Sequence, residues 1–144
     1  METPIMGKVL VSALIENMAD LILADEGVIP PDRIRRLEVR DALVDTGATS
    51  LCMPKRLIQQ LGLRPLRTRR IRTAAGLATA QLYGSVRLTI QERDCLSDVT
   101  ELSDDCPVLI GQIPLESLDF VVDPIAQRVI GNPAHGGEQI IEVY

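Results

Sequence analysis

The residues best suited to chemistry lie at 45–50, where the sequence reads Asp-Thr-Gly-Ala-Thr-Ser. Apolar runs at 42–44 and 51–53 flank this stretch, so we expect a tight turn between two buried strands. The turn presents the carboxylate of Asp45, a small hydroxyl and a flexible backbone at one place. Activation of water by carboxylates that share a proton needs two of them. Because the chain has one such turn, the motif predicts that two chains combine to form one site.

The rest of the sequence indicates an all-β domain of many short strands with one or two short helices. The clearest strand signal lies at 81–91, where apolar and polar residues alternate. Residues 9–15 favour a strand, with a helix as the alternative because apolar residues recur at helical spacing as far as 22. The expected strands are 9–15, 36–44, 69–73, 78–91, 95–102, 108–111, 120–122, 128–130 and 139–144. The expected helices are 54–61 and 114–118, each with a proline at its first position.

Length and composition indicate a single domain with an aliphatic core. The chain has 144 residues, of which 46% are hydrophobic and only 2% aromatic. Its net charge of −5 does not favour a nucleic-acid partner. The arginine-rich stretch at 64–72 is the exception: such runs are usually solvated surface, and nucleic-acid binding is the alternative.

The cysteines and the N-terminal segment bear on where the protein works. Cys52, Cys95 and Cys106 include no closely spaced pair. We therefore expect reduced thiols in a cytoplasmic protein, with a Cys95–Cys106 bridge as the alternative. Residues 9–23 are apolar but carry two acidic side chains, so we expect neither a membrane span nor a signal peptide.

Together these motifs resemble those of the retropepsin-like, or retroviral-type, aspartic proteases in their bacterial single-domain form. The shared features are the turn at 45–50, the hairpin around Gly76 and a second apolar-apolar-glycine element at 108–111. Their order and spacing hold over about 6–132, which is most of the chain.

The resemblance implies a closed, barrel-like all-β fold that works as a homodimeric endopeptidase without a metal or cofactor. Asp45 of each protomer would be catalytic, with an activated water between the pair and a peptide or protein as substrate. The protease domain would cover 1–132, and the tail at 133–144 is a candidate strand of the dimer interface. Neither nucleic acid nor a membrane is expected as a partner. The resemblance assigns supporting roles to Thr46, Gly47, Ala48 and Thr49 in the active loop, to Ala75, Gly76 and Leu77 in a flap over the substrate, and to Leu109, Ile110 and Gly111 beneath the loop.

Other interpretations of the same residues stay open. The flap tip is built from small residues such as Ala74 and Ala75, so a dimer that binds peptides without hydrolysing them is the alternative function. The Asp-Thr-Gly stretch is otherwise a plain polar turn or a phosphoryl-transfer motif. A nucleophile pair or zinc site that uses His135 has less support, because this residue lies in a glycine-bearing tail and the cysteines are not closely spaced.

Overall fold

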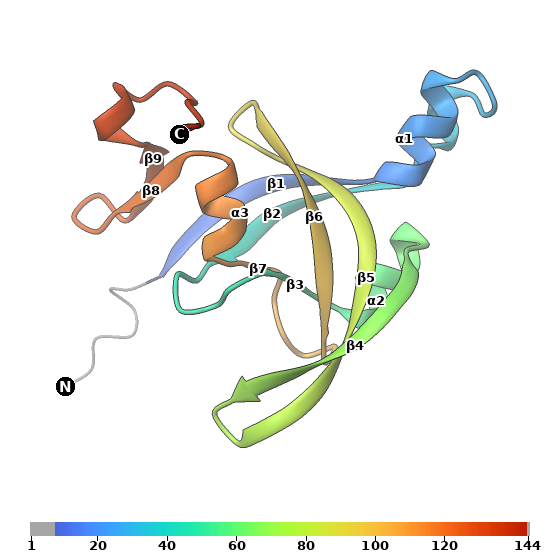
Figure 1. The fold of residues 1–144 in the computed structure, drawn as a ribbon, viewed down its shortest axis with the longest axis horizontal. Coiled ribbons are helices and arrows are strands. Elements are labelled where there is room, and N and C mark those ends of the chain that lie inside the picture. Colours follow the sequence, from blue (N-terminus) through green and yellow to red (C-terminus); the bar gives the residue numbers. More distant parts are fainter. Residues whose placement is uncertain (1–7, 144) are drawn as a thin grey trace.

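Alternating apolar residues build a closed β barrel in the computed structural model, which describes residues 8–143 (Figure 1). In the longest strand, Leu82, Val86, Leu88 and Ile90 are buried, as the alternation predicts. The strands follow the order β1-β2-β7-β3-β6-β5, and pairing of β1 with β5 closes the ring. The barrel strands are β1 (Val9–Asn17), β2 (Arg36–Val44), β3 (Leu51–Pro54), β5 (Gly76–Ile90), β6 (Arg93–Leu102) and β7 (Leu109–Ile110).

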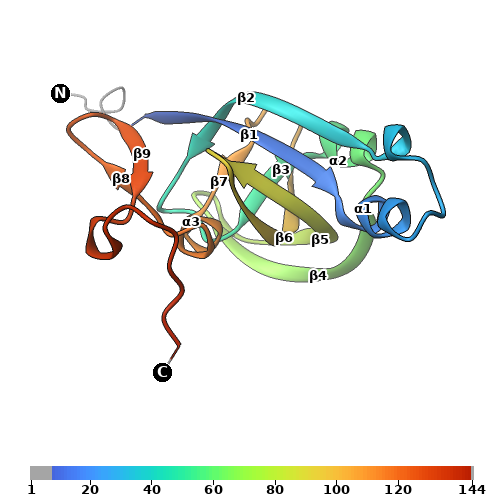
Figure 2. The ribbon, with the colours of Figure 1, turned by 90° about the horizontal axis from the view of Figure 1, so that it is seen from above.

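Two hairpins stand apart from this ring. Strand β4 (Arg64–Thr73) comes last in the strand order, paired with β5, and this hairpin projects from the barrel (Figure 1). Strands β8 (Phe120–Asp123) and β9 (Arg128–Gly131) form a separate two-stranded sheet, at the end of the molecule away from residues 18–25 (Figure 2). The helices are short: α1 (Met18–Asp25), α2 (Lys55–Leu61) and α3 (Gln112–Ser117), with 3-10 turns η2 (Pro31–Arg33) and η3 (Pro133–His135).

The core is aliphatic, as the composition predicts. Its largest fully buried side chains come from several barrel strands and from α2 and α3, and Phe120 is the buried aromatic residue among those described. They include Ile15, Leu51, Met53, Ile58, Leu61, Leu88, Ile90, Ile110, Leu115 and Leu118. Burial of these side chains is the main force that holds the barrel closed.

The N-terminal segment contains both structures that its sequence allowed. It begins as strand β1 and turns into helix α1 at Asn17, whose side-chain oxygen accepts a hydrogen bond from the Asp20 backbone at 3.1 Å. The amide of Asn17 also donates to the Leu61 carbonyl at 2.8 Å, which ties the bend to the end of α2. None of the described helices has the length and apolar character that crossing a bilayer requires.

A buried carboxylate reinforces the closure of the barrel. Glu16 of β1 lies opposite Arg36 of β2 and Arg87 of β5 in the two strand pairings. Its oxygens accept hydrogen bonds from Arg36 at 3.1 Å and from Arg87 at 2.8 Å. A carboxylate paired on both sides costs far less to bury than a lone one.

Several predicted boundaries need correction. Pro54 ends strand β3 and caps α2 instead of occupying its first position, while Gly62 stops the helix at φ +65 as expected. Helix α3 begins at Gln112, two residues before Pro114. The strand expected at 139–144 is wrong for residues 139–143, which form no strand, and Tyr144 lies outside the described residues.

Candidate active site

The neighbouring strand β7 anchors the loop at 45–50 through a hydrogen bond to its first residue, Asp45. Strand β2 runs parallel to β7, and the backbone N–H of Asp45 donates to the carbonyl of Ile110 at 3.0 Å. The next turn is closed by the Ala48 N–H, which donates to the Asp45 carbonyl at 3.0 Å. The Gly47 N–H donates to Oδ1 of Asp45 at 2.9 Å, so the carboxylate has a fixed direction.

The second predicted element lies directly beneath this loop. The Gly111 N–H donates to the Ser50 carbonyl at 3.1 Å, and the Gln112 and Ile113 N–H groups donate to the carbonyls of Ala48 and Thr49 at 2.9 Å. A Cβ on Gly111 would lie 2.4 Å from the Ser50 carbonyl oxygen. Glycine is therefore required for space at this position.

The C-terminal end of the loop is closely packed and carries no charged side chain at Ser50 or Cys52. Ser50 Oγ and Thr100 Oγ1 of strand β6 share a hydrogen bond of 3.0 Å. Cys52 is buried next to this pair, and its burial raises the pKa of the thiol. A protonated buried thiol packs as a small apolar group, so Cys52 contributes to the packing beneath the loop.

The other face of the loop is open to solvent. Thr46, Gly47 and Thr49 are exposed, whereas Asp45 and Ala48 are half-buried. The hydroxyl of Thr46 forms no hydrogen bond with any residue of the described chain. Gly47 does not use a left-handed backbone; its missing side chain leaves room next to the Asp45 carboxylate, which a Cβ would approach to 3.2 Å.

The predicted flap is the hairpin of β4 and β5, with a tip shorter than expected. The turn itself is Ala74-Ala75, and Gly76 already belongs to β5 at φ +115, a backbone conformation that suits glycine. Thr73 Oγ1 accepts from the Ala75 N–H and donates to the Gly76 carbonyl, both at 3.1 Å. The Leu77 side chain is exposed. No hydrogen bond among residues 8–143 joins this tip to the Asp45 loop, so the two parts stand separately.

Similarity to a known family agrees with this geometry. A family model described as "gag-polyprotein putative aspartyl protease" matches residues 36–131, which include the loop, the hairpin and the glycine element. The chain belongs to this aspartyl protease family. No curated protein matches the chain. Since the matched region is most of the barrel, the retroviral-type fold predicted from the motifs is confirmed.

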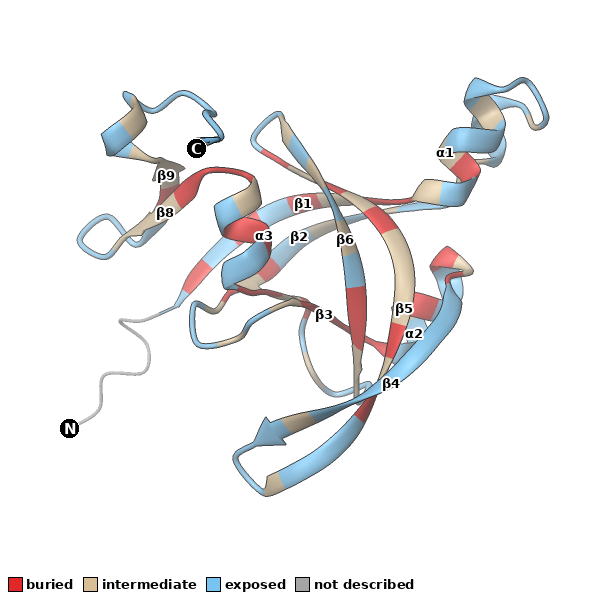
Figure 3. Ribbon diagram, in the orientation of Figure 1, coloured by how far each residue is buried: buried red, intermediate tan, exposed pale blue. Residues whose placement is uncertain are grey.

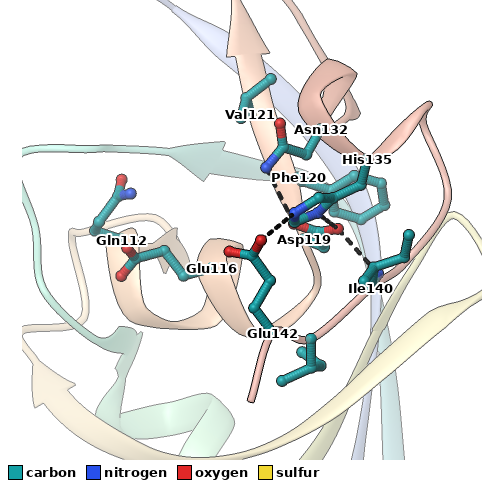
Figure 4. A pocket seen from close by; sticks show the side chains of 10 residues that line it. Gln112, Glu116, Asp119, Phe120, Val121, Asn132, His135, Ile140 and Glu142 are labelled. Carbon is teal, nitrogen blue, oxygen red and sulfur yellow. Dashed lines mark hydrogen bonds and ion pairs between the residues drawn. The ribbon is translucent and has the colours of Figure 1, made fainter. Parts of the chain in front are cut away.

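One cluster in this aspartyl protease-like chain has no counterpart among the sequence predictions. Asp119, at φ +57, accepts hydrogen bonds from His135 Nδ1 at 2.6 Å, from the Ile140 N–H at 3.0 Å and from Asn132 at 3.2 Å (Figure 4). The tail around His135 is therefore held against the rest of the chain, although its sequence is glycine-bearing. The signal is weak, because Asp119 and His135 lie 16 positions apart with no motif between them.

Arg93 of strand β6 fastens the same region from the other side. Its guanidinium donates to the carbonyls of Leu118 at 3.0 Å and Asp119 at 2.8 Å, and it also reaches the carbonyl of Gly137. It lies over the Phe120 ring at 4.5 Å from the ring centre. The cluster thus joins the barrel, the β8–β9 hairpin and the tail.

The Asp119–His135 pair predicts a pH-dependent hold on the tail. The bond from the Ile140 N–H, and then that from His135, lowers the pKa of Asp119, while Asp119 raises the pKa of His135. The histidine contribution is full below its usual pKa of about 6.5 and is lost as the pH rises through the raised value. The aspartate contribution is full above its usual pKa of about 4 and is lost as the pH falls through the lowered value.

Hydrogen exchange at the Ile140 amide tests this expectation. We expect protection to be strongest between about pH 4 and about pH 6.5 and to weaken at alkaline pH, after correction for the intrinsic exchange rate. In the control variant His135→Gln, protection at alkaline pH should no longer depend on pH. A wild-type protein whose protection stays constant from about pH 5 to about pH 9 would contradict the assignment.

Proposed function

We propose that two copies of this chain form an aspartic endopeptidase in which each copy contributes Asp45. One observation carries the proposal: the family match spans a loop whose lone Asp-Thr-Gly turn offers a half-buried, oriented carboxylate on an open face. A single carboxylate supplies only half of the acid–base machinery. A two-fold axis close to Thr46 brings a second Asp45 to the same place.

The reaction follows from the pairing of these carboxylates. Two carboxyl groups within hydrogen-bond reach share one proton, because ionising both in one place is costly. Aspartic proteases are known for such a dyad, in which the two pKa values lie well apart. The ionised Asp45 takes a proton from a water molecule between the pair, and the protonated Asp45 donates to the oxygen of the scissile carbonyl. Water attacks directly, so no acyl-enzyme forms and no metal or cofactor is needed.

Neighbouring residues support this chemistry by position. The Gly47 N–H holds one oxygen of Asp45 at 2.9 Å, which leaves the other oxygen for water. The exposed hydroxyl of Thr46 suits a hydrogen bond across the dimer axis, and the exposed Thr49 suits the substrate backbone. Ala48 carries no hydroxyl next to the carboxylate, and Gly111 supports the loop from below.

The flap and the tail complete the proposed dimer. The tip at Ala75, Gly76 and Leu77 closes over a peptide or protein substrate and reduces the access of water. The tail at 133–144 carries exposed apolar residues, Ile140, Ile141 and Val143, which suit a contact with the partner chain. We assign the enzyme to the cytoplasm, with neither a nucleic-acid nor a membrane partner, and the three free thiols support a reducing compartment.

The dimer makes a direct prediction about dilution. Specific activity on a peptide substrate should fall as the enzyme is diluted from micromolar to nanomolar, because each site needs two chains. Light scattering over the same range should show the dimer dissociating in parallel. Constant specific activity in a protein that scatters as a monomer would rule out a site shared between chains.

A dimer that binds peptides without cleaving them is the second candidate. The observation in its favour is the flap tip, where Ala74 and Ala75 are exposed and offer little surface to exclude water. Binding of peptides without any cleavage that depends on Asp45 would favour this alternative.

A further inference from the structure

The flap carries an unusual concentration of positive charge. Strand β4 contains five arginines in ten residues, Arg64, Arg67, Arg69, Arg70 and Arg72, and all of them are exposed (Figure 3). None of the five forms an ion pair within residues 8–143. The segment 55–91 has no Asp or Glu, so all 20 acidic residues of the chain lie elsewhere. The net charge of −5 therefore hides a basic hairpin.

The strand register assigns these arginines to opposite faces of the hairpin. Residues directly opposite each other in an antiparallel pair share a face. Arg67 lies opposite Leu82 and Arg69 opposite Ala80, and both β5 partners are buried. These two arginines therefore share the face that continues into the barrel interior.

The remaining arginines of the strand serve as an internal comparison. Arg70 lies opposite Thr79 and Arg72 opposite Leu77, and both of these β5 residues are exposed. Arg70 and Arg72 consequently belong to the outer face of the hairpin. The chain thus presents two arginine pairs of equal charge, one on each side of the flap.

The fold does not neutralise the inner pair. Arg67 and Arg69 are two residues apart on the same side of one strand, and their cross-strand neighbours are apolar. Like charges so placed repel each other and gain nothing from folding. An anionic partner under the flap would relieve this repulsion and would gain two guanidinium contacts.

We propose that Arg67 and Arg69 are specificity-determining residues that select peptide substrates with acidic side chains under the flap. This inference rests on the proposed function, because it places substrate between the inner face of the flap and the Asp45 loop. Arg69 lies four residues before the end of β4 at Thr73, or ~14 Å at about 3.4 Å per residue. Since an extended substrate has the same rise, the selected Asp or Glu lies about four residues from the scissile bond.

An acidic peptide suits this surface better than a nucleic acid does. Single-stranded nucleic acids are bound by basic grooves combined with aromatic side chains that stack on bases. Strand β4 contains no aromatic residue. Tyr83 of β5 is half-buried, with its hydroxyl donating to Glu101 at 2.6 Å.

Cleavage-site profiling tests the inference in the intact enzyme. A peptide mixture from a trypsin-digested cell extract is incubated with the wild type, with Arg67→Gln/Arg69→Gln, and with the control pair Arg70→Gln/Arg72→Gln. We expect the sites cleaved by the wild type to be enriched in Asp and Glu about four residues from the scissile bond. The value of kcat/KM for an acidic peptide should fall ~10-fold in the Arg67→Gln/Arg69→Gln variant and stay unchanged in the control pair. Equal losses in both variant pairs, or no enrichment in the wild type, would overturn the proposal. Sites that the Asp45→Asn protein also cleaves do not depend on Asp45 and are left out of the profile.

A binding measurement keeps the inference decidable if the protein does not cleave peptides. The Asp45→Asn protein is titrated with a fluorescent peptide carrying Glu at these positions and with its Gln counterpart, near neutral pH. The Glu peptide should bind ~10-fold more tightly than the Gln peptide. Substitution of the inner pair, Arg67→Gln/Arg69→Gln, should remove that preference, whereas substitution of the outer pair, Arg70→Gln/Arg72→Gln, should leave it intact. Equal affinity for both peptides refutes the selection, whatever the catalytic result. A single-stranded DNA oligonucleotide is titrated in the same way. If it binds more tightly than the Glu peptide, and both variant pairs weaken its binding equally, the ligand of the hairpin is a nucleic acid and the proposal is wrong.

Discussion

Replacing Asp45 by Asn should reduce peptide cleavage by ~10³-fold or more while the protein stays folded and dimeric. Asparagine cannot take a proton from water, and a site with two amides has no acid to donate to the carbonyl. The fold should tolerate the change, because the Asn side-chain oxygen can still accept the Gly47 N–H that Asp45 Oδ1 accepts at 2.9 Å. The measurement combines hydrolysis of a fluorogenic peptide with light scattering and a thermal melt. Undiminished cleavage by the variant would refute a role for Asp45.

Mixing the two proteins extends this prediction to the shared site. If each site needs one Asp45 from each chain, a refolded equimolar mixture of wild type and Asp45→Asn retains active sites only in wild-type pairs. Compared with wild type at the same total protein concentration, random pairing of the chains leaves about a quarter of the activity. A site built within one chain would instead leave about half. The ratio therefore measures how many carboxylates each site uses, without depending on the absolute rate. A value near half would remove the dyad from the mechanism and leave a one-chain site.

The elements around the active loop can be predicted from the sequence because their signals are local. Strand β2 begins and ends at Arg36 and Val44 as predicted, since its alternation and the following turn are both written in adjacent residues. The place of Gly111 beneath the loop came from the family resemblance, because the run at 108–111 lies about 60 positions from the turn and its pattern alone does not bring the two together. Resemblance to a family adds the order of these elements, which composition alone does not fix.

Other parts could not be predicted, because their structure depends on contacts with residues far away in the sequence. Strand β4 starts at Arg64, five residues before the predicted start, since Gly84 and Tyr83 of β5 supply its backbone partners. Residues 139–143 have the pattern of a strand but pair with no strand among the described residues. Asp119 binds the Ile140 N–H from 21 positions away. Strand propensity takes effect only when a strand is paired with a partner edge, and residues 139–143 lie at no such edge in the described part of the chain.

Gly111→Ala should destabilise the protein by about 3 kcal/mol and displace the active loop. The backbone of Gly111 lies at φ −85, which any residue can adopt, so the cost comes from contact alone. The new Cβ would lie 2.4 Å from the Ser50 carbonyl oxygen and 2.7 Å from the Ser50 nitrogen and the Thr49 carbonyl carbon. These are backbone atoms that cannot rotate away, so the loop must move and carry Asp45 with it. Urea denaturation gives the free energy of unfolding, and peptide hydrolysis reports the displacement.

Gly27→Ala is the matched control, because Gly27 differs from Gly111 both in its backbone conformation and in the space around its missing Cβ. Gly27 has a left-handed backbone at φ +76 but has open space around its missing Cβ. Its substitution should cost only about 1 kcal/mol, all of it from backbone strain, and should leave the rate of hydrolysis unchanged. If both variants lost stability equally while hydrolysis stayed intact in both, the support of the Asp45 loop would not depend on the close approach at Gly111. The expected combination is a larger loss of stability together with a loss of activity for Gly111→Ala alone, and it would link the position of the Asp45 carboxylate to the close backbone contact at Gly111.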